Sequence, residues 1–525
     1  MNDILRKKLS REDNVELITK WVVGSIMIFT ALEAIFYPET ENLYGCVTFL
    51  VGWALLYNFV LKVKGKERNK CLLPYLALFG LGICFFWLPL VLTFIEGKPL
   101  TFRFENPYLT FNNQLLNLVM LILAYRLCLK VYRPNNPIQR LWKSMGYFTP
   151  PTDLQIWVMG IIGLVSYFLI LTLQGSDDAK SENFGVLGHL LSVLRTFSSF
   201  PFLLLMKQSY GGNPKEKASR IPIIVYFVVI LILGLATGKR TAILGPVVTI
   251  VICFLLPVFT VNKHLFSVRN TFFILVGIYF VTGPVADMAA AMALGRDNSG
   301  NTSASKTFEK VWHIYQDKEM LHNLYQMSLA NFDNNGKNDN GWSEYYVDNI
   351  LFDRFCNIRV CDATLHYAEK LGYDNSRMHD YFEKRMQYLI PTPILRVFGL
   401  RTSKFGVQYT PGDLMSTEGL ALRHQYVGYR VAGDTGIGLY LWGYKYYIYA
   451  LFIFFLFFYF LSTKILIVRS GMVILSLPEI CDLFRTFLTF NNDTGIIGII
   501  TILLRTGWQT ILVYCMLYYI VRKIV

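Results

Sequence analysis

The amino-acid sequence predicts an all-α membrane protein with about twelve spanning helices and one large hydrophilic loop. Of its 525 residues, 54% are hydrophobic and only 16% are charged, whereas about 25% of the residues in a soluble domain are charged. Apolar runs of about 18 residues recur along the chain, and each can cross a hydrocarbon layer of roughly 30 Å as a helix. Basic residues concentrate between alternate runs, as expected where Lys and Arg stay in the cytoplasm.

The first apolar run, from Trp21 to Tyr37, follows a basic N-terminal segment and lacks the small-residue pattern of a signal-peptide cleavage site. We therefore expect it to persist as the first span. Later runs are separated by polar or charged segments. The predicted spans are 21–37, 43–61, 71–95, 114–129, 155–173, 185–206, 221–237, 241–260, 271–293, 436–461, 470–488 and 494–521.

The placement of charge predicts the orientation of these spans. Segments rich in Lys and Arg, such as 62–70 and 207–220, alternate with short loops that carry acidic residues, such as 38–42 and 174–184. Spans that alternate in direction put all the basic segments in the cytoplasm, together with both termini. Topology then accounts for the net charge of +14, and we expect a lipid bilayer, and no nucleic acid, as the partner.

Alternation also divides the chain into three parts. The first group of spans lies in 1–294, an extracytoplasmic loop domain follows in 295–434, and the last spans lie in 435–525. Apolar residues in the loop recur near helical spacing, so we expect a helical domain packed on the outer face of the membrane. Its predicted helical segments are 306–329, 345–371 and 378–389.

The sequence offers little evidence for a metal centre or a cofactor. Most Cys residues fall inside apolar runs, where they are expected to act as small buried hydrophobes. Cys356 and Cys361 share a polar segment, but no further Cys or His follows at zinc-ligand spacing, and a disulfide between them is left open. Asp177 and Asp178 are similar to the acidic metal sites of some lipid-linked sugar transferases, yet one pair is weak evidence. No nucleotide-binding loop of the P-loop form is present, and we predict no metal site.

The most informative short motif is the turn Gly238-Lys239-Arg240-Thr241, between two predicted spans. Alternation places its two cations on the outer side, against the orientation rule. A bound anion would favour this placement, because the planar guanidinium of Arg240 can donate two parallel hydrogen bonds to a phosphate. Thr241 begins the next helix, whose N-terminal amides also favour an anion. The alternative is that both side chains reach out to lipid headgroups.

Arg195 and Arg505 are further candidates within predicted spans. Arg195 lies in the sixth predicted span, with His189 nearer its outer end, and Arg505 lies in the last span. An Arg at membrane depth usually faces a cavity or a charged partner. Arg195 is therefore either a functional residue or the partner of an intramembrane carboxylate such as Glu33 or Asp287.

The loop ends in a segment rich in basic residues and glycine. Arg423, His424 and Arg430 precede the return to the membrane. His424 is the best general-base candidate, because the ordinary pKa of His is near physiological pH. The alternative is that a junction between loop and membrane commonly carries basic and aromatic residues. Close backbone approach or tight turns are predicted at Gly433, Gly436 and Gly438.

The eleventh predicted span contains three charged residues, Glu479, Asp482 and Arg485, at spacings that place neighbours on one helical face. We favour a structural interpretation for them. Either they form an internal network of ion pairs, or the segment is amphipathic and does not cross the membrane.

These features together make the chain similar to the Wzy-type polysaccharide repeat-unit polymerases, the O-antigen and exopolysaccharide polymerases of bacterial envelopes. The likeness rests on the layout of many spans with one large loop before the last ones, on the turn Gly238-Lys239-Arg240-Thr241, and on the glycine-punctuated segment from Gly433 to Gly443. Lys239 stands where a small residue is more usual in this family. The motifs cover a small part of the chain, whereas the architecture covers most of it.

The resemblance implies an integral-membrane glycosyltransferase of the GT-C type in the bacterial inner membrane, with its loop in the periplasm. The enzyme would move a growing glycan from undecaprenyl diphosphate onto a lipid-linked repeat unit, without a nucleotide sugar, metal or cofactor. A chain-length regulator and a flippase of the same pathway are further implied partners. The implied site residues are Arg240 with Lys239, Thr241 and Arg195 for the diphosphate, then Arg423 and Arg430, and His424 as the base.

Three other functions fit the same architecture. An O-antigen ligase-like transferase would use a different acceptor. A flippase or another transporter of lipid-linked glycans is less favoured, because no internal repeat is visible and transporter sites usually lie at mid-membrane. A non-catalytic assembly protein of an envelope polysaccharide system is the third.

Overall fold

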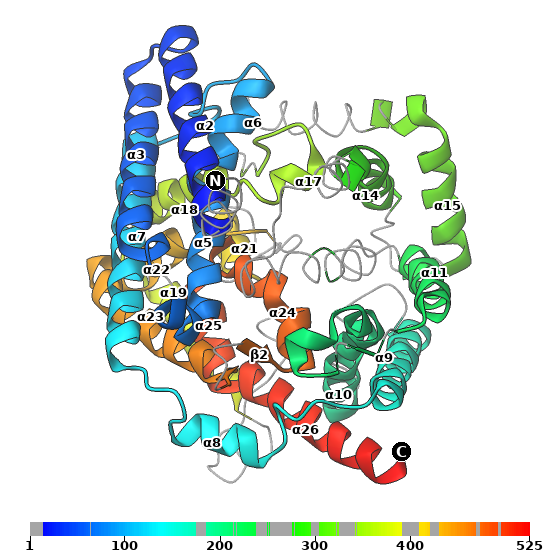
Figure 1. The fold of residues 1–525 in the computed structure, drawn as a ribbon. Helices are drawn as coiled ribbons and strands as arrows, with labels where there is room; N and C mark the ends of the chain where they lie inside the picture. Colours follow the sequence, from blue (N-terminus) through cyan, green and yellow to red (C-terminus); the bar gives the residue numbers. More distant parts are fainter. Residues whose placement is uncertain are drawn as a thin grey trace, which may run out of the picture.

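The computed structural model describes residues 14–525 except 64, 175–184, 214, 217, 238–248, 250, 252–275, 278, 296–303, 322, 325–341, 343, 391–408, 421–429, 469–472 and 492–494. The described residues are helical almost throughout, with one two-stranded sheet. The predicted all-α class is therefore confirmed. Figure 1 shows α2, α3 and α7 along one side of the molecule and α11, α14 and α15 on the other.

Among the described residues, eight helical segments are long and apolar enough to cross a membrane. They coincide with eight of the predicted spans. They comprise α2 Asn14–Phe36; α3 Thr40–Leu56 with η1 Tyr57–Leu61; α5 Leu72–Phe86 with α6 Leu88–Ile95; α7 Pro107–Val131; α9 Asp153–Gln174; α10 Gly185–Arg195 with η3 Thr196–Tyr210; α22 Asp434–Trp442 with η6 Gly443–Lys445 and α23 Tyr446–Thr463; and α25 Gly495–Thr501 with η8 Ile502–Thr506 and α26 Gly507–Ile524.

The remaining predicted spans have different outcomes. The run at 221–237 forms α11 Arg220–Thr237, whose apolar stretch from Arg220 to Leu233 is shorter than the others. The run at 241–260 and most of 271–293 lie outside the described residues, and the end of the latter forms η4 Val281–Val285 and α14 Ala286–Leu294. The helices α4 Gly65–Lys70 and α8 Pro137–Ser144 connect spans.

The prediction of a spanning helix at 470–488 is wrong. Strands β1 Ile465–Ile467 and β2 Val473–Leu475 pair antiparallel, with Ile465 opposite Leu475. The following α24 Leu477–Phe487 has 11 residues and is about 16 Å long at 1.5 Å per residue, which is too short to cross a bilayer. Pro478 stands in its first turn, where proline favours the start of a helix. The short η7 Thr489–Asn491 follows α24.

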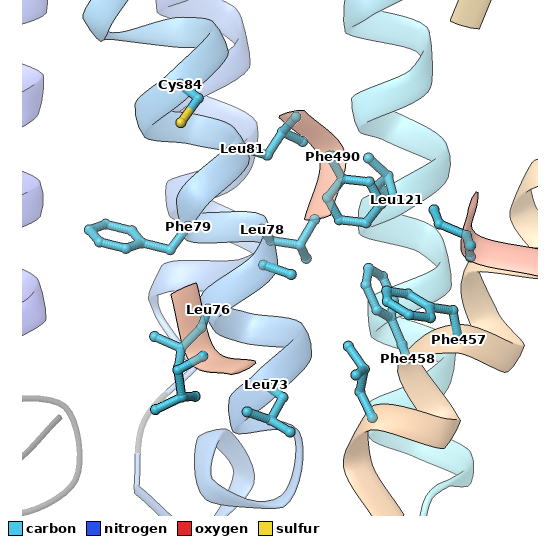
Figure 2. Close-up of a cluster of buried hydrophobic side chains, with 14 of the residues drawn as sticks. Leu73, Leu76, Leu78, Phe79, Leu81, Cys84, Leu121, Phe457, Phe458 and Phe490 are labelled. Atoms are coloured by element: carbon cyan, nitrogen blue, oxygen red, sulfur yellow. The ribbon is translucent and has the colours of Figure 1, made fainter. Parts of the chain in front are cut away.

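The centre of the bundle is α5. Apart from Ile83, every residue from Leu72 to Phe86 is buried, and a helix that is apolar on all sides must be surrounded by protein. At Gly80 the backbone of α24 comes so close that an added Cβ would lie 1.9 Å from the carbonyl oxygen of Phe487. Figure 2 shows Leu73, Leu76, Leu78, Phe79, Leu81 and Cys84 of α5 near Leu121 of α7, Phe457 and Phe458 of α23, and Phe490 of η7.

The predicted helix 345–371 is interrupted, because residues 344–349 and 354–357 are not helical. Otherwise the described parts of the predicted loop domain are mainly helical. They form α15 Ala304–Gln316, α17 Ile350–Asp353, α18 Ile358–Leu371, α19 Ser376–Leu389 and α21 Pro411–Gly419. α15 packs on α11 and α14 around a separate apolar cluster, and α18 packs on α22, α21 and α7. These helices thus lie directly on apolar helices of the bundle.

Candidate functional site

One face of α7 is polar, although this helix is long and apolar enough to span. Thr110, Asn113, Gln114 and Asn117 are all buried, and their spacing of three and four residues places them on one side of the helix. Asn113 accepts a hydrogen bond from the hydroxyl of Tyr447. Asn117 accepts one from the hydroxyl of Tyr446 over 3.1 Å and Thr110 donates one to α18. Polar groups at membrane depth usually face protein or a cavity, so this face marks the polar interior of the bundle.

The loop helix α18 is attached to the start of α7 by a buried carboxylate. The oxygens of Asp362 accept hydrogen bonds from the backbone amides of Glu105 at 2.7 Å and Asn106 at 3.0 Å, and from the hydroxyl of Thr110 at 2.8 Å. Nη1 of Arg359 lies 2.7 Å from the same carboxylate. Both charged side chains are almost completely buried. This arrangement holds α18 over the polar face of α7.

Glycines let α22 pack closely against α18. A Cβ added to Gly433 would lie 2.6 Å from Sγ of Cys361, and one added to Gly436 would lie 2.8 Å from Cβ of Thr364. A Cβ on Gly438 would lie 2.0 Å from the ring of Tyr446. The predicted close approach at these three glycines is therefore confirmed.

Asp434 is the most unusual residue at this junction. It is the first residue of α22 and is 8% exposed. Neither carboxylate oxygen has a hydrogen-bond partner within the described part of the chain. A Cβ on Gly495 of α25 would lie 2.8 Å from Oδ1 of Asp434, so the carboxylate faces the last span. The positive end of the α22 dipole offsets part of the cost of this charge, and no described residue donates a hydrogen bond to its oxygens.

Asp434 and the polar face of α7 are not among the site residues predicted from the sequence. A signal for each was present. Asp434 is an acid two residues before a predicted span, and carboxylates within the membrane are usually functional. The polar residues of α7 have helical spacing inside an apolar run. Their partners come from distant parts of the chain.

Arg430, a predicted site residue, lies four residues before Asp434. Its backbone amide donates to Oδ1 of Asp413 over 3.1 Å, and its carbonyl accepts from the hydroxyl of Thr410 over 2.7 Å, so its backbone is fixed on the N-terminus of α21. The next amide, that of Val431, donates to half-buried Glu344 over 2.7 Å. Burial raises the pKa of Glu344, and the positive charges of nearby arginines, including Arg430, partly oppose the shift.

Arg195 ends α10, and its guanidinium lies 5.9 Å from the ring centre of Tyr167. The two proposed carboxylate partners are engaged elsewhere. Asp287 pairs with Lys318 at 2.7 Å, and Glu33 accepts a hydrogen bond from Asn42 at 2.7 Å. The alternative explanation of Arg195 as a partner of these acids is therefore not supported.

Arg505 lies in the π-helical turn η8 of the last span, and its Nη1 donates to the carbonyl of Tyr388 at the end of α19 over 3.2 Å. It links the last span to a loop helix. The other predicted site residues lie outside the described residues. They are Lys239, Arg240, Thr241, Arg423 and His424. Asp177, Asp178 and the side chain of His189 also lie outside the described residues.

Cys356 and Cys361 are both buried free thiols, so the structure contains no disulfide between them. No cluster of three or more His, Cys, Asp or Glu residues that could hold a metal ion occurs within the described residues. Gly433 approaches Cys361 too closely for a larger residue. The two thiols therefore act in packing, as expected for buried cysteines.

Of the two structural interpretations of Glu479, Asp482 and Arg485, the short helix α24 agrees with a segment that does not cross the membrane, and Glu479 forms an ion pair outside the segment. Oε2 of Glu479 lies 3.0 Å from Nζ of Lys464, and the hydroxyl of Tyr147 donates to the same oxygen over 3.3 Å. Glu479 and Lys464 are both buried. The pair joins the start of α24 to the end of α23, and the structural interpretation of Glu479 is supported.

Comparison of the chain with models of known protein families, with curated proteins and with solved structures finds no significant match.

Proposed function

We propose that this membrane protein is a glycosyltransferase that joins undecaprenyl-diphosphate-linked oligosaccharide repeat units into a surface polysaccharide on the periplasmic side. The similarity of the sequence to repeat-unit polymerases supports this proposal. The single structural observation that carries it is Asp434, a buried carboxylate without a partner in the described part of the chain, which begins the span that follows the loop.

The proposed reaction breaks the bond between the anomeric carbon of the growing glycan and its diphosphate oxygen. A new bond forms between that carbon and a hydroxyl oxygen of the lipid-linked acceptor, whose proton passes to a base. Undecaprenyl diphosphate is released with one additional negative charge, on the oxygen that was bonded to the anomeric carbon. Arg240, Arg423 and Arg430 are the proposed contacts of this leaving group. Removal of one such contact would lower the rate about 10²–10³-fold, by analogy with oxyanion donors.

The proton acceptor is either His424 or Asp434 in this proposal. A base must come within hydrogen-bond distance of the acceptor hydroxyl, and a carboxylate whose oxygens have no partner among the described residues has lone pairs for that purpose. Helix α22 holds Asp434 rigidly, because glycines on either side of it pack on α18. His424 lies ten residues earlier in the sequence.

The first test is deletion of the gene, followed by separation of the cell's surface and lipid-linked glycans by size. The proposal predicts loss of the long ladder with single repeat units retained. A full-length ladder left on the undecaprenyl carrier would instead indicate a ligase. Loss of all surface repeat units would indicate a flippase, and an unchanged pattern would contradict a role in the glycans tested.

The site is tested by complementing the deletion with single variants. Arg240→Ala, His424→Ala and Asp434→Asn are each expected to shorten the ladder, with the protein present in the membrane at the wild-type level. Asp380→Asn is the matched control, because Asp380 is exposed on α19 and pairs only with Lys384 among the described residues. A normal ladder with Asp434→Asn and a short one with His424→Ala would assign the base to His424. Normal ladders with all three variants would reject the proposed site.

A further inference from the structure

A cleft of about 440 Å³ opens near the C-terminal ends of α3 and α7. The contacts of Asp362 lie at the other end of α7. The volume of the cleft is within the range of small-molecule sites. The cleft lies where η1, α4 and the C-terminal part of α7 meet. Its polar lining consists of Asn58, Lys62, Glu67, Arg126 and Lys130.

The charge of the cleft is positive and only partly neutralised. Its one acid, Glu67, is already paired with Lys70 at 2.5 Å. Lys62 donates to Oδ1 of Asn58 over 2.7 Å, which leaves its charge in place. Arg126 and Lys130 stand one helical turn apart, are exposed, and form no ion pair or hydrogen bond with other described residues. Like charges at this spacing repel each other, so an anion between them would be stabilising.

An apolar seam leads into this cationic cleft. The exposed side of α3 carries Val47, Val51 and Ala54 and ends at Asn58 in the cleft. The exposed side of α7 carries Leu116 and Leu123 and reaches the cleft one turn later. The two helices lie side by side (Figure 1). At the far end of the seam, the hydroxyl of Tyr44 donates to Asn112 over 2.5 Å and closes it.

We propose that this cleft and seam bind one anionic glycerophospholipid of the bilayer. Its phosphate lies between Arg126, Lys130 and Lys62, and its acyl chains lie along the apolar sides of α3 and α7. Basic pockets between spanning helices recognise lipid headgroups in this way. The segment 62–70 is predicted to be cytoplasmic, which assigns the lipid to the inner leaflet. The proposal is independent of the glycosyltransferase proposal.

The test uses the purified full-length protein in mixed vesicles of phosphatidylcholine and phosphatidylglycerol, followed by native mass spectrometry in mild detergent to count retained lipids. Arg126→Gln with Lys130→Gln removes the two cations that have no partner among the described residues. Ala54→Trp leaves every charge in place and blocks the seam. The matched control is Arg522→Gln with Lys523→Gln, which removes one Arg and one Lys from the exposed end of α26.

We expect the wild-type protein and the control to retain one more phosphatidylglycerol than the cleft variant and Ala54→Trp. The affinity for this lipid should fall roughly 30-fold in the cleft variant, or about fivefold for each cation, and high salt should weaken binding to the wild-type protein. Equal retention by all four proteins would overturn the proposal. Displacement of the lipid by millimolar inorganic phosphate would also overturn it. So would weaker retention in the cleft variant together with wild-type retention in Ala54→Trp, because each outcome denies a role to the acyl chains.

Discussion

The contact between Asp362 and Arg359 leads to a sharp prediction about how the loop is attached to the spans. Asp362→Ala removes the acceptor for two backbone amides and one hydroxyl, and it removes the closest partner of Arg359, whose side chain is 3% exposed. The only other carboxylate within ion-pair distance of Arg359 among the described residues is that of Glu105, at 3.5 Å and 52% exposed. Arg359 would thus be left buried with one weak partner.

The expected cost follows from this burial. Breaking a buried ion pair by removing one partner costs about 3–5 kcal/mol, and each backbone amide left without an acceptor costs about 1–3 kcal/mol where water cannot reach it. These costs overlap, because relaxation of α18 relieves several of them together. We therefore expect the free energy of opening of α18 to fall by about 3 kcal/mol, which corresponds to roughly 100-fold faster amide exchange.

Hydrogen exchange measured peptide by peptide in detergent is the appropriate assay, because it separates α18 from the rest of the protein. Asp380→Ala is the control. It breaks the ion pair between Asp380 and Lys384. Both side chains are at least half exposed, and such pairs contribute about 0.3–0.5 kcal/mol. The double variant Arg359→Met with Asp362→Leu should recover much of the loss, since no unpaired charge stays buried. Exchange in α18 that is equally fast in Asp362→Ala and Asp380→Ala would refute the reasoning.

Three further predictions concern packing, pH and the second buried ion pair. Gly436→Ala should destabilise the protein by about 1–3 kcal/mol because the new Cβ would overlap α18, whereas Gly24→Ala, with no atom within 4 Å of the added Cβ, should not lower the thermal midpoint. Burial raises the pKa of Asp353 to about 6 from 3.8, so the charged carboxylate destabilises the folded state by up to about 3 kcal/mol at pH 7, and this cost disappears as the pH falls below about 4. Asp353→Asn should therefore stabilise the protein at pH 7 and not at pH 4 in denaturant titrations. Equal effects at both pH values would contradict the shift of the pKa. Glu479→Gln leaves Lys464 buried without its charged partner and should cost about 3–5 kcal/mol, while Glu479→Leu with Lys464→Met should unfold near the wild-type midpoint; a single variant as stable as the double one would show that the pair is dispensable.

Local chemistry in the sequence determined most of the spanning helices. The cost of exposing a backbone polar group to lipid makes a long apolar run helical whatever surrounds it, and α2, α3, α5 and α7 lie where hydropathy predicted them. The close approach at Gly433 and Gly436 was also predictable, because a residue without a Cβ is required wherever two backbones nearly touch.

Other features depended on contacts that no local pattern contains. The segment at 470–488 is apolar enough to suggest a span, yet pairing between β1 and β2 shortens it to α24, and strand pairing is a relation between two segments. Asp362 accepts a hydrogen bond from the backbone amide of Glu105, and more than half of the preceding chain separates the two residues. Tertiary packing also decided that Asp434 is buried beside Gly495 with no partner among the described residues. The sequence shows which side chains are charged, but only the fold decides which of them lose water and what replaces it.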